Sequence, residues 1–291
     1  MRSIKLASSL ILDISFNFKP TAMFSKPRKN KFVKSYGSWG LVTGASSGIG
    51  KEISHCWASL GIHLVLTGRN VRALKALSTT LEETYGIHTD LIVADLSNIG
   101  DIEMLIHSLG DLPVGIFVGS AGFGTSGPFT KSNLGDELEM LQVNTIALMM
   151  LTHHFARRFS QLGKGGIVLL SSIVGFQGVP NATNYAATKA YVQALGEGLY
   201  HELKPYGVDV VTAAPGPVES GFAHRANMKM KNALRPEDVA WPILKALGKR
   251  AVVFPGTLTK ILILGLRTVP RWGKIKIMQK VMSGMTQHQP A

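Results

Sequence analysis

The chain has 291 residues, 45% of them hydrophobic and 17% charged, a balance that excludes a disordered protein and allows one domain with a sizeable core. Its formal net charge of +13 is divided between the two ends, because residues 1–39 carry +7, residues 256–291 carry +6 and the stretch between them is neutral. A neutral body with two basic ends is unlike a dedicated nucleic-acid-binding domain, so we expect no nucleic-acid partner.

From residue 38, short apolar runs rich in Val, Ile and Leu alternate with longer stretches of helical period. This alternation predicts an α/β fold: a doubly wound Rossmann-type three-layer sandwich with a seven-stranded parallel sheet. The predicted strands are 39–43, 63–67, 90–94, 114–118, 166–170, 208–213 and 251–254. The predicted helices are 49–60, 71–85, 99–109, 134–162, 184–203 and 236–247.

We find no internal repeat, low-complexity tract or long linker, so residues 36–255 are predicted to form one domain. Residues 1–35 are predicted to be a basic, flexible extension. Within it, residues 1–22 are either a targeting segment or a disordered or misassigned stretch that precedes a natural start at Met23. Residues 256–291 are predicted to form an apolar and basic helical extension.

Several simple signals of secretion and metal binding are missing from the sequence. Cys56 is the single cysteine, which leaves no disulfide partner, and the nine histidines show no metal-ligand spacing. The apolar run at residues 4–18 is interrupted by Lys5 and Asp13, which makes it too short and too polar to span a bilayer. We expect no metal and a cytoplasmic location, with membrane association through the basic ends as an alternative.

The first predicted strand runs directly into TGASSGIG at residues 43–50, and a predicted helix follows. Glycines at such a turn let the backbone approach a pyrophosphate, whose charge is favoured by the free N–H groups and dipole of the helix. The alternative is a tight turn that binds nothing. This alternative is less favoured, because the turn opens the first βαβ unit. The predicted contacts to a dinucleotide from this turn are Gly44, Ser46, Ser47, Gly48, Ile49 and Gly50.

The residues after the second predicted strand bear on the choice between NAD(H) and NADP(H). A site selective for NAD usually has an acidic residue here, which grips the ribose 2′-hydroxyl. This chain has Arg69 and Asn70 instead, and a guanidinium can hold a 2′-phosphate through charge-assisted hydrogen bonds. We therefore favour NADP(H). The alternative for Arg69 is a solvated side chain on the surface.

The glycine turn, Ser172 and the run YAATK at residues 185–189 together resemble the short-chain dehydrogenase/reductase family in its single-domain form. The resemblance covers about residues 36–250, in the order and spacing typical of the family. It implies an oxidoreductase that moves a hydride between NADP(H) and a small-molecule carbonyl or alcohol. It also implies a homo-oligomer.

Tyr185 and Lys189 lie four residues apart on a predicted helix, so their side chains project from one face. A phenol with an ordinary pKa of about 10 is a poor base, and a neighbouring ammonium is expected to lower that pKa. The resemblance implies that Tyr185 exchanges a proton with the substrate oxygen. It also implies that Lys189 tunes the phenol and binds the nicotinamide ribose.

Two further residues match the catalytic set of the family. Ser172 ends a predicted strand and would orient the substrate oxygen, with Ser171 as the competing assignment. Asn144 matches the fourth member, which implies a kinked helix and an ordered water beside Lys189. An asparagine that merely caps or kinks the helix is the alternative for Asn144.

Other positions match cofactor contacts of the family. They are Asp95 and Leu96 after the third predicted strand, Ala121 and Gly122 after the fourth, and Pro215, Gly216, Val218 and Ser220 after the sixth. The sequence departs from the family pattern at Gly119 and Ser120, where two asparagines are usual. This change is expected to remove a hydrogen bond that braces the sheet, which puts local rigidity in doubt.

Residues 221–235 should form a mobile lid over the nicotinamide segment, with Phe222, Met228 and Met230 as an apolar lining. Phe123, Val174 and Phe176 are expected near the same place, which favours a lipophilic ketone, aldehyde or 3-oxoacyl substrate. Packing of the lid on the body is the alternative explanation for these apolar residues.

The C-terminal extension has apolar stretches at 258–269 and 275–285 beside Arg267, Arg271 and Trp272. These residues could lie at a membrane interface, although helical packing on the body or on a partner subunit is favoured. Two functions other than catalysis stay open at this point. They are a cofactor-binding regulatory sensor without turnover and a peripheral membrane protein.

Overall fold

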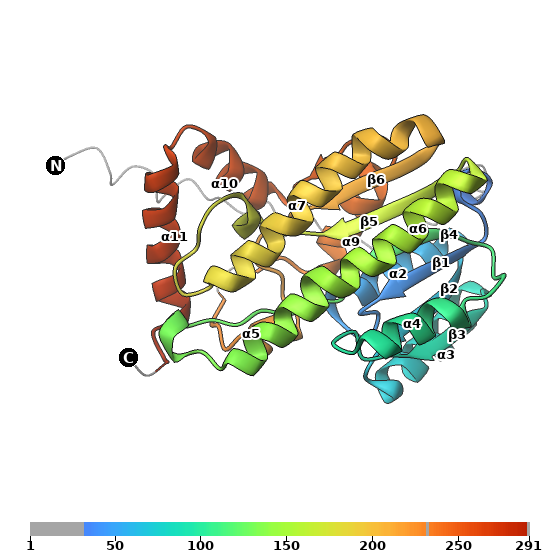
Figure 1. The fold of residues 1–291 in the computed structure, drawn as a ribbon, viewed down its shortest axis with the longest axis horizontal. Coiled ribbons are helices and arrows are strands. Elements are labelled where there is room, and N and C mark those ends of the chain that lie inside the picture. Colours follow the sequence, from blue (N-terminus) through green and yellow to red (C-terminus); the bar gives the residue numbers. More distant parts are fainter. Residues whose placement is uncertain (1–31, 231–232, 290–291) are drawn as a thin grey trace.

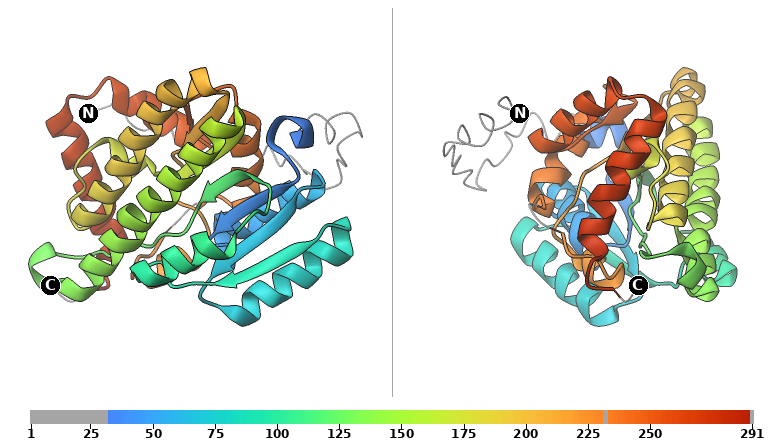
Figure 2. Two further views of the ribbon diagram at one scale, coloured as in Figure 1. Left: turned by 45° about the vertical axis from the view of Figure 1, so that its right-hand side comes forward. Right: turned by 90° about the vertical axis from the view of Figure 1, so that its left-hand side faces the viewer.

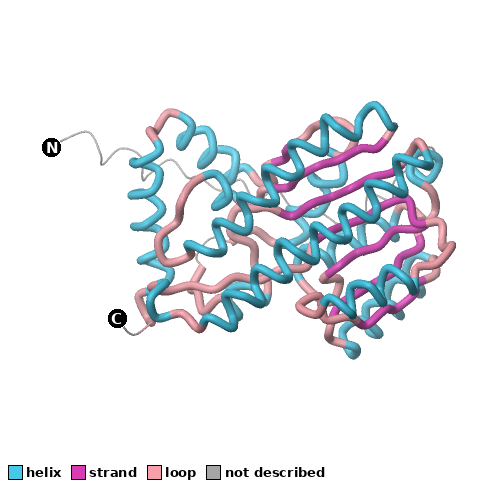
Figure 3. Tube along the Cα trace, viewed as in Figure 1, coloured by secondary structure: helices cyan, strands magenta, loops and turns pink. Residues whose placement is uncertain are grey.

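The computed structural model describes residues 32–230 and 233–289. Its centre is the predicted seven-stranded parallel sheet, with strand order β3-β2-β1-β4-β5-β6-β7, and this order reverses between β1 and β4 (Figures 1 and 3). The strands are β1 (Trp39–Thr43), β2 (His63–Gly68), β3 (Thr89–Val93), β4 (Val114–Gly119), β5 (Gly165–Leu170), β6 (Val208–Ala213) and β7 (Val252–Val253). The edge strand β7 is shorter than predicted, because it pairs only with the last two residues of β6.

Helices cover both faces of the sheet, which confirms the predicted doubly wound sandwich (Figure 1). One face carries α2 (Gly48–Ser59), α3 (Val71–Tyr85) and α9 (Pro236–Ala246). The other carries α4 (Ile99–Ser108), α6 (Leu148–Leu162) and α7 (Thr183–Leu203). Successive strand residues point to opposite faces, so Ile116 and Val118 of β4 join the core under α2, α3 and α9, and Phe117 joins the core under α4, α6 and α7.

The single helix predicted at 134–162 is interrupted in the structure. α5 (Leu134–Leu141) and α6 are separated by a π-helical turn, η2 (Gln142–Ala147), which contains the buried Asn144. Single π-turns inside α-helices often occur at functional sites. A π-helical turn thus interrupts the helix at Asn144, where the sequence predicts a kink. Shorter 3-10 turns are η1 (Phe129–Lys131), η3 (Ile173–Phe176) and η4 (Lys204–Tyr206).

Three further helices stand at the end of the sheet where the strands finish: α8 (Gly221–Arg225), α10 (Thr257–Arg267) and α11 (Arg271–Thr286). α10 and α11 form the outer layer at this end of the molecule, at the left of Figure 1 and toward the viewer in the right panel of Figure 2. α11 begins at Arg271, earlier than the predicted stretch at 275–285. In the part of the chain that the structure describes, no helix is long and apolar enough to cross a membrane.

At the other end of the sequence, residues 32–36 form a helical turn. The ring of Phe32 lies 5.3 Å from the ring of Trp57, centroid to centroid, and Phe32 and Val33 pack against the core of the α2 side. The folded body therefore begins before residue 36, which corrects the predicted boundary of the extension at 1–35. Residues 1–31 of that predicted extension lie outside the described residues.

Candidate active site

A cavity of about 560 Å³ opens at the carboxyl ends of the strands, where the strand order reverses. This is the place where doubly wound sheets bind their ligands. The cavity collects every predicted site residue except Asn144: Gly44, Ser46, Ser47, Gly48, Ile49, Gly50, Arg69, Asn70, Asp95, Leu96, Ala121, Gly122, Ser172, Tyr185, Lys189, Pro215, Gly216, Val218 and Ser220. Among residues 32–230 and 233–289, no three His, Cys, Asp or Glu side chains group as a metal site would require.

The glycine turn after β1 has the shape that a pyrophosphate requires. Gly44 has a φ of +65°, and a Cβ at this position would lie 2.8 Å from the Cα of Ala121. The side chains of Asn70 and Asn98 cap the N-termini of α3 and α4, whereas Ser47 makes no such bond at the N-terminus of α2. The first N–H groups of α2 thus face the cavity without a side-chain cap, and they fit the phosphates of a dinucleotide.

Hydroxyl groups brace β1 against β4 at the cavity floor. The Thr43 hydroxyl donates to Val118 O (3.2 Å) and accepts from the Ser120 amide (3.1 Å), while the Ser120 hydroxyl donates to Thr43 O. A side chain at Gly119 would collide with Leu148. The expected loss of bracing is therefore wrong, because hydrogen bonds of Thr43 and Ser120 join the two strands at this point.

The far end of the cofactor groove is polar and partly exposed. Arg69 Nη1 lies 3.1 Å from Glu139 Oε1 and 3.5 Å from Asp95 Oδ2, and half of the Arg69 side chain is exposed. Burial raises the pKa of Asp95, but hydrogen bonds from Ser97 and the charge of Arg69 outweigh it and the pKa is lowered. A cation at this edge fits a 2′-phosphate. The side chain of Asn70 is used within the fold instead, because it accepts a hydrogen bond from Ala73 N (3.0 Å) and caps α3.

Glu139 is a neighbour of Arg69 that the sequence analysis missed. Its Oε1 atom also pairs with Arg225 Nη2 at 2.8 Å, and the guanidinium of Arg225 lies 3.3 Å from the ring centroid of Phe123. One carboxylate thus links the cofactor end of the groove to α8. No local pattern could indicate this, because the three charged residues come from segments far apart in the chain.

We predict that Glu139→Gln strengthens NADPH binding about two- to fivefold, because Arg69 is released and a negative charge near the 2′-phosphate is removed. NADH binding should stay unchanged, since NADH carries no 2′-phosphate. Fluorescence titration with both cofactors measures the effect, and Glu103→Gln on α4 serves as the charge-matched control. Weaker NADPH binding in Glu139→Gln would show that Glu139 supports the groove and does not compete for Arg69.

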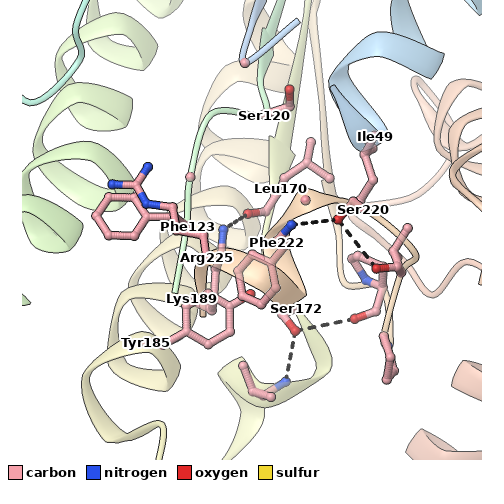
Figure 4. Close-up of a pocket in the computed structure, with 18 of the residues that line it drawn as sticks. Ile49, Ser120, Phe123, Leu170, Ser172, Tyr185, Lys189, Ser220, Phe222 and Arg225 are labelled. Carbon is pink, nitrogen blue, oxygen red and sulfur yellow. Dashed lines mark hydrogen bonds between the residues drawn. The ribbon is translucent and has the colours of Figure 1, made fainter. Parts of the chain in front are cut away.

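Tyr185 and Lys189 are both buried on the face of α7 that closes the middle of the cavity (Figure 4). Lys189 Nζ donates to Leu170 O (2.8 Å) and lies 5.8 Å from the Tyr185 ring centroid. Burial lowers the pKa of Lys189 to about 8. Burial also raises the pKa of Tyr185 above its ordinary value, against the opposing effect of a hydrogen bond with Ser172. The expected lowering of the phenol pKa by Lys189 is therefore wrong for this structure.

The structure distinguishes the two candidate serines. Ser171 Oγ donates to Lys189 O (2.8 Å), so this hydroxyl fastens α7 to β5. Ser172 Oγ faces the Tyr185 phenol and lies near Pro215 O and Val174 N, at 3.4 Å from each. The geometry thus favours Ser172 over Ser171 as the hydroxyl that a substrate oxygen can reach.

Asn144 lies behind the cavity wall and does not line the cavity. Its Oδ1 accepts from Phe123 N (3.1 Å), and its Nδ2 donates to Phe123 O (2.8 Å) and to Thr188 Oγ1 (3.1 Å). The first two bonds pair the backbone N–H and C=O of Phe123, which lies in the loop after β4 and not in a strand. Asn144 thus positions the loop against α7, next to Tyr185 and Lys189.

The segment after β6 approaches the glycine turn from the opposite side of the cavity. A Cβ at Gly48 would lie 3.0 Å from the Cβ of Ser220. Val218 forms an isolated parallel bridge with Leu234, and Ser220 Oγ accepts from Phe222 N (3.3 Å) at the start of α8 (Figure 4). Val218 and Ser220 are thus held beside the glycine turn.

The other half of the cavity is apolar, and the C-terminal helices form much of its wall. Phe222, Met228 and Met230 line it as expected, although residues 231–232 of the predicted lid lie outside the described residues. Phe123 and Val174 also line it, but Phe176 packs against Phe254 and does not reach the cavity. Further wall residues, which were not predicted from the sequence, come from α10 and α11: Leu262, Leu266, Ile277, Met278, Val281, Met282 and Met285.

Polar contacts fasten the end of α11 to the lid. Gln289 Nε2 donates to Ser126 Oγ (2.8 Å) and to Asn227 O (2.7 Å), and His288 Nε2 lies 3.0 Å from Asn227 Oδ1. The Lys229 amide donates to Met285 O (2.9 Å). The C-terminal extension is therefore part of the cavity wall.

Residues 39–231 match the family described as short chain dehydrogenase, and the chain belongs to that family. It is therefore an oxidoreductase that acts on hydroxyl or carbonyl groups with a nicotinamide dinucleotide, as the fold and the cavity allow.

Characterised relatives support this assignment. The chain is 30% identical to a 7beta-hydroxysteroid dehydrogenase of Clostridium sardiniense over 79% of this chain and 89% of that protein. It is 30% identical to a 3-oxoacyl-(acyl-carrier-protein) reductase of Rickettsia typhi over 71% of this chain and 88% of that protein. A short-chain dehydrogenase from Sphingobium yanoikuyae, solved in complex with NADPH, is 31% identical with a TM-score of 0.73, over 87% of this chain and 98% of that chain.

Proposed function

We propose that this protein reduces a bulky, lipophilic ketone, aldehyde or 3-oxoacyl compound to the alcohol, with NADPH as the hydride donor. One observation carries the proposal: Ser172, Tyr185 and Lys189 meet at the middle of a cavity that is polar on one side and apolar on the other. The polar side fits the cofactor, and the apolar side is left for the substrate. A non-catalytic sensor would not need a protonated phenol where the two sides meet.

Each residue of this group has a separate role in the proposed reaction. Tyr185 donates its phenolic proton to the substrate oxygen, since its raised pKa keeps the phenol protonated at neutral pH. Ser172 donates a hydrogen bond to the same oxygen and orients it. Lys189 binds the nicotinamide ribose, and Asn144 positions the loop behind Tyr185 and Lys189. When bound, NADPH supplies the hydride that the carbonyl carbon accepts.

The preference for NADPH rests on Arg69, whose guanidinium lies at the edge of the groove near Asp95 and Glu139. When NADPH binds, this guanidinium can pair with the 2′-phosphate in place of these carboxylates. An acidic residue in its place would repel a 2′-phosphate. The related enzyme from Sphingobium yanoikuyae, solved with NADPH, supports this choice.

The proposed substrate class rests on the apolar wall. Met228, Met230, Met278, Met282 and Met285 line the cavity, and methionine side chains adapt to irregular apolar shapes. A flat or branched apolar skeleton fits such a wall better than a sugar does. The relative that is named a hydroxysteroid dehydrogenase supports this class.

The test is turnover of a ketone panel that runs from small aliphatic ketones to polycyclic ones, with NADPH consumption as the readout. We expect Met282→Trp, which fills the apolar half, to lower kcat/KM at least tenfold for bulky ketones and to change it little for small ones. Met104→Trp, at an exposed position on α4 outside the cavity, is the matched control. NADPH binding without turnover of any carbonyl would replace this proposal with the sensor function.

The homo-oligomer and the cytoplasmic location predicted from the sequence stay part of this proposal. Light scattering after size exclusion measures the first, and cell fractionation measures the second.

A further inference from the structure

The outer surface of α10 and α11 exposes large apolar side chains. Ile261 is 61% exposed, and Leu264 and Trp272 are each 66% exposed; Leu258 is also exposed. We call these four residues the α10–α11 patch. Single exposed apolar residues are common, but several large ones on adjoining helices mark an interaction surface.

The cavity opens beside this patch. Leu262, Ile277 and Val281 line the cavity and are also about two-fifths exposed. Side chains that face both the cavity and the outside lie at its mouth, so an apolar compound can pass between them without crossing a polar surface. The patch residues and the mouth residues all belong to α10 and α11, which form one outer layer of the molecule (Figure 2).

The segment that carries the patch is basic. Residues 256–291 contain six Lys or Arg residues and no acidic residue. Lys276 Nζ lies 5.6 Å from the Trp272 ring centroid, so one of these cations lies directly against a residue of the patch. A helix surface with Trp and aliphatic residues beside Lys and Arg is typical of binding at the interface of an anionic bilayer.

A second copy of this chain is a poorer fit for the patch. A symmetric interface would place the same surface on both subunits, and the basic residues around it would then face one another. An anionic surface neutralises these charges while the apolar side chains enter its outer layer.

We propose that the α10–α11 patch docks the protein on an anionic lipid surface, and that the lipophilic substrate enters from the bilayer through the mouth between Leu262, Ile277 and Val281. The second part rests on the proposed function. The first part, docking, depends only on the surface of α10 and α11.

The test is co-sedimentation of the full chain with vesicles of phosphatidylcholine alone and with about one third phosphatidylglycerol. We expect binding to the anionic vesicles only, and a partition coefficient at least tenfold lower for the double variant Ile261→Glu/Leu264→Glu. The matched control is Leu162→Glu/Tyr206→Glu, which makes the same change in charge at exposed sites just before β5 and β6, at the amino ends of the strands and therefore at the opposite end of the sheet. Because the N-terminal residues are unchanged in both, a selective loss assigns binding to the patch.

Two further measurements make the result decisive. A blue shift of tryptophan emission on adding anionic vesicles should vanish in Trp272→Phe. Turnover of a small, water-soluble ketone should be the same in Ile261→Glu/Leu264→Glu as in the unchanged protein, which separates docking from catalysis and shows that the variant is folded.

The proposal is overturned if the unchanged protein ignores anionic vesicles, if it binds neutral vesicles equally well, or if the double variant binds like the unchanged protein. It is also overturned if light scattering shows that the double variant splits an oligomer while vesicle binding persists, because the patch would then be a subunit interface.

Discussion

Replacing Tyr185 by Phe is expected to lower the rate of carbonyl reduction about a thousandfold, because the substrate oxygen then has no general acid beside it. NADPH binding should stay within about twofold, since the phenyl ring keeps its place against Phe222, whose ring centroid lies 5.1 Å away. Steady-state consumption of NADPH with the best ketone of the panel measures the first effect, and fluorescence titration measures the second.

Tyr191→Phe is the matched control, because Tyr191 lies on the same helix but is 40% exposed and outside the cavity. Its kinetics should equal those of the unchanged protein. If Tyr185→Phe keeps most of its activity while its thermal midpoint is unchanged, Tyr185 is not the proton donor and another group in the cavity must fill that role.

Replacing Arg69 by Gln is expected to weaken NADPH binding about 10- to 100-fold, because a charged hydrogen bond to the 2′-phosphate contributes about 1.5–3 kcal/mol. NADH binding should change little, so that the preference for NADPH largely disappears. Dissociation constants for both cofactors, measured at fixed ionic strength, test the prediction.

Arg157→Gln removes the same charge from the exposed side of α6, away from the cofactor groove, and controls for the loss of net positive charge. If Arg69→Gln weakens both cofactors equally, Arg69 shapes the adenosine end of the groove without selecting between them. If it weakens neither, Arg69 stays paired with Glu139 when the cofactor binds, and the preference is decided elsewhere.

Much of the fold could be predicted because its signals are local. Alternation of apolar runs with helical stretches predicts buried parallel strands, and the turn at residues 43–50 predicts the strand-to-helix junction at which Gly44 adopts positive φ. The spacing of Tyr185 and Lys189 predicts one face of one helix, and both residues lie buried on α7. The period of a helix alone is enough to tell which of its residues share a face.

Other features depend on segments that meet only in the folded chain. The bracing at Thr43 and Ser120 joins β1 to β4, and Glu139 pairs with two arginines that are 70 and 86 residues away in the sequence. Sequence comparison with a family motif indicated that an asparagine was missing, but it could not show which hydroxyl replaces its hydrogen bond. A hydrogen bond between residues far apart in the sequence produces no periodic pattern in that sequence.

By itself, therefore, the sequence determined the doubly wound sheet, the cofactor turn and the spacing of the Tyr185 and Lys189 pair, because each follows from short-range periodicity or from a local backbone requirement. Only the tertiary structure decided that burial outweighs Ser172 in the pKa of Tyr185, because desolvation depends on every element packed around the phenol. Only the tertiary structure also decided that Met278 and Met282 face the cavity, because an apolar helix can turn its side chains toward any surface that the rest of the chain presents.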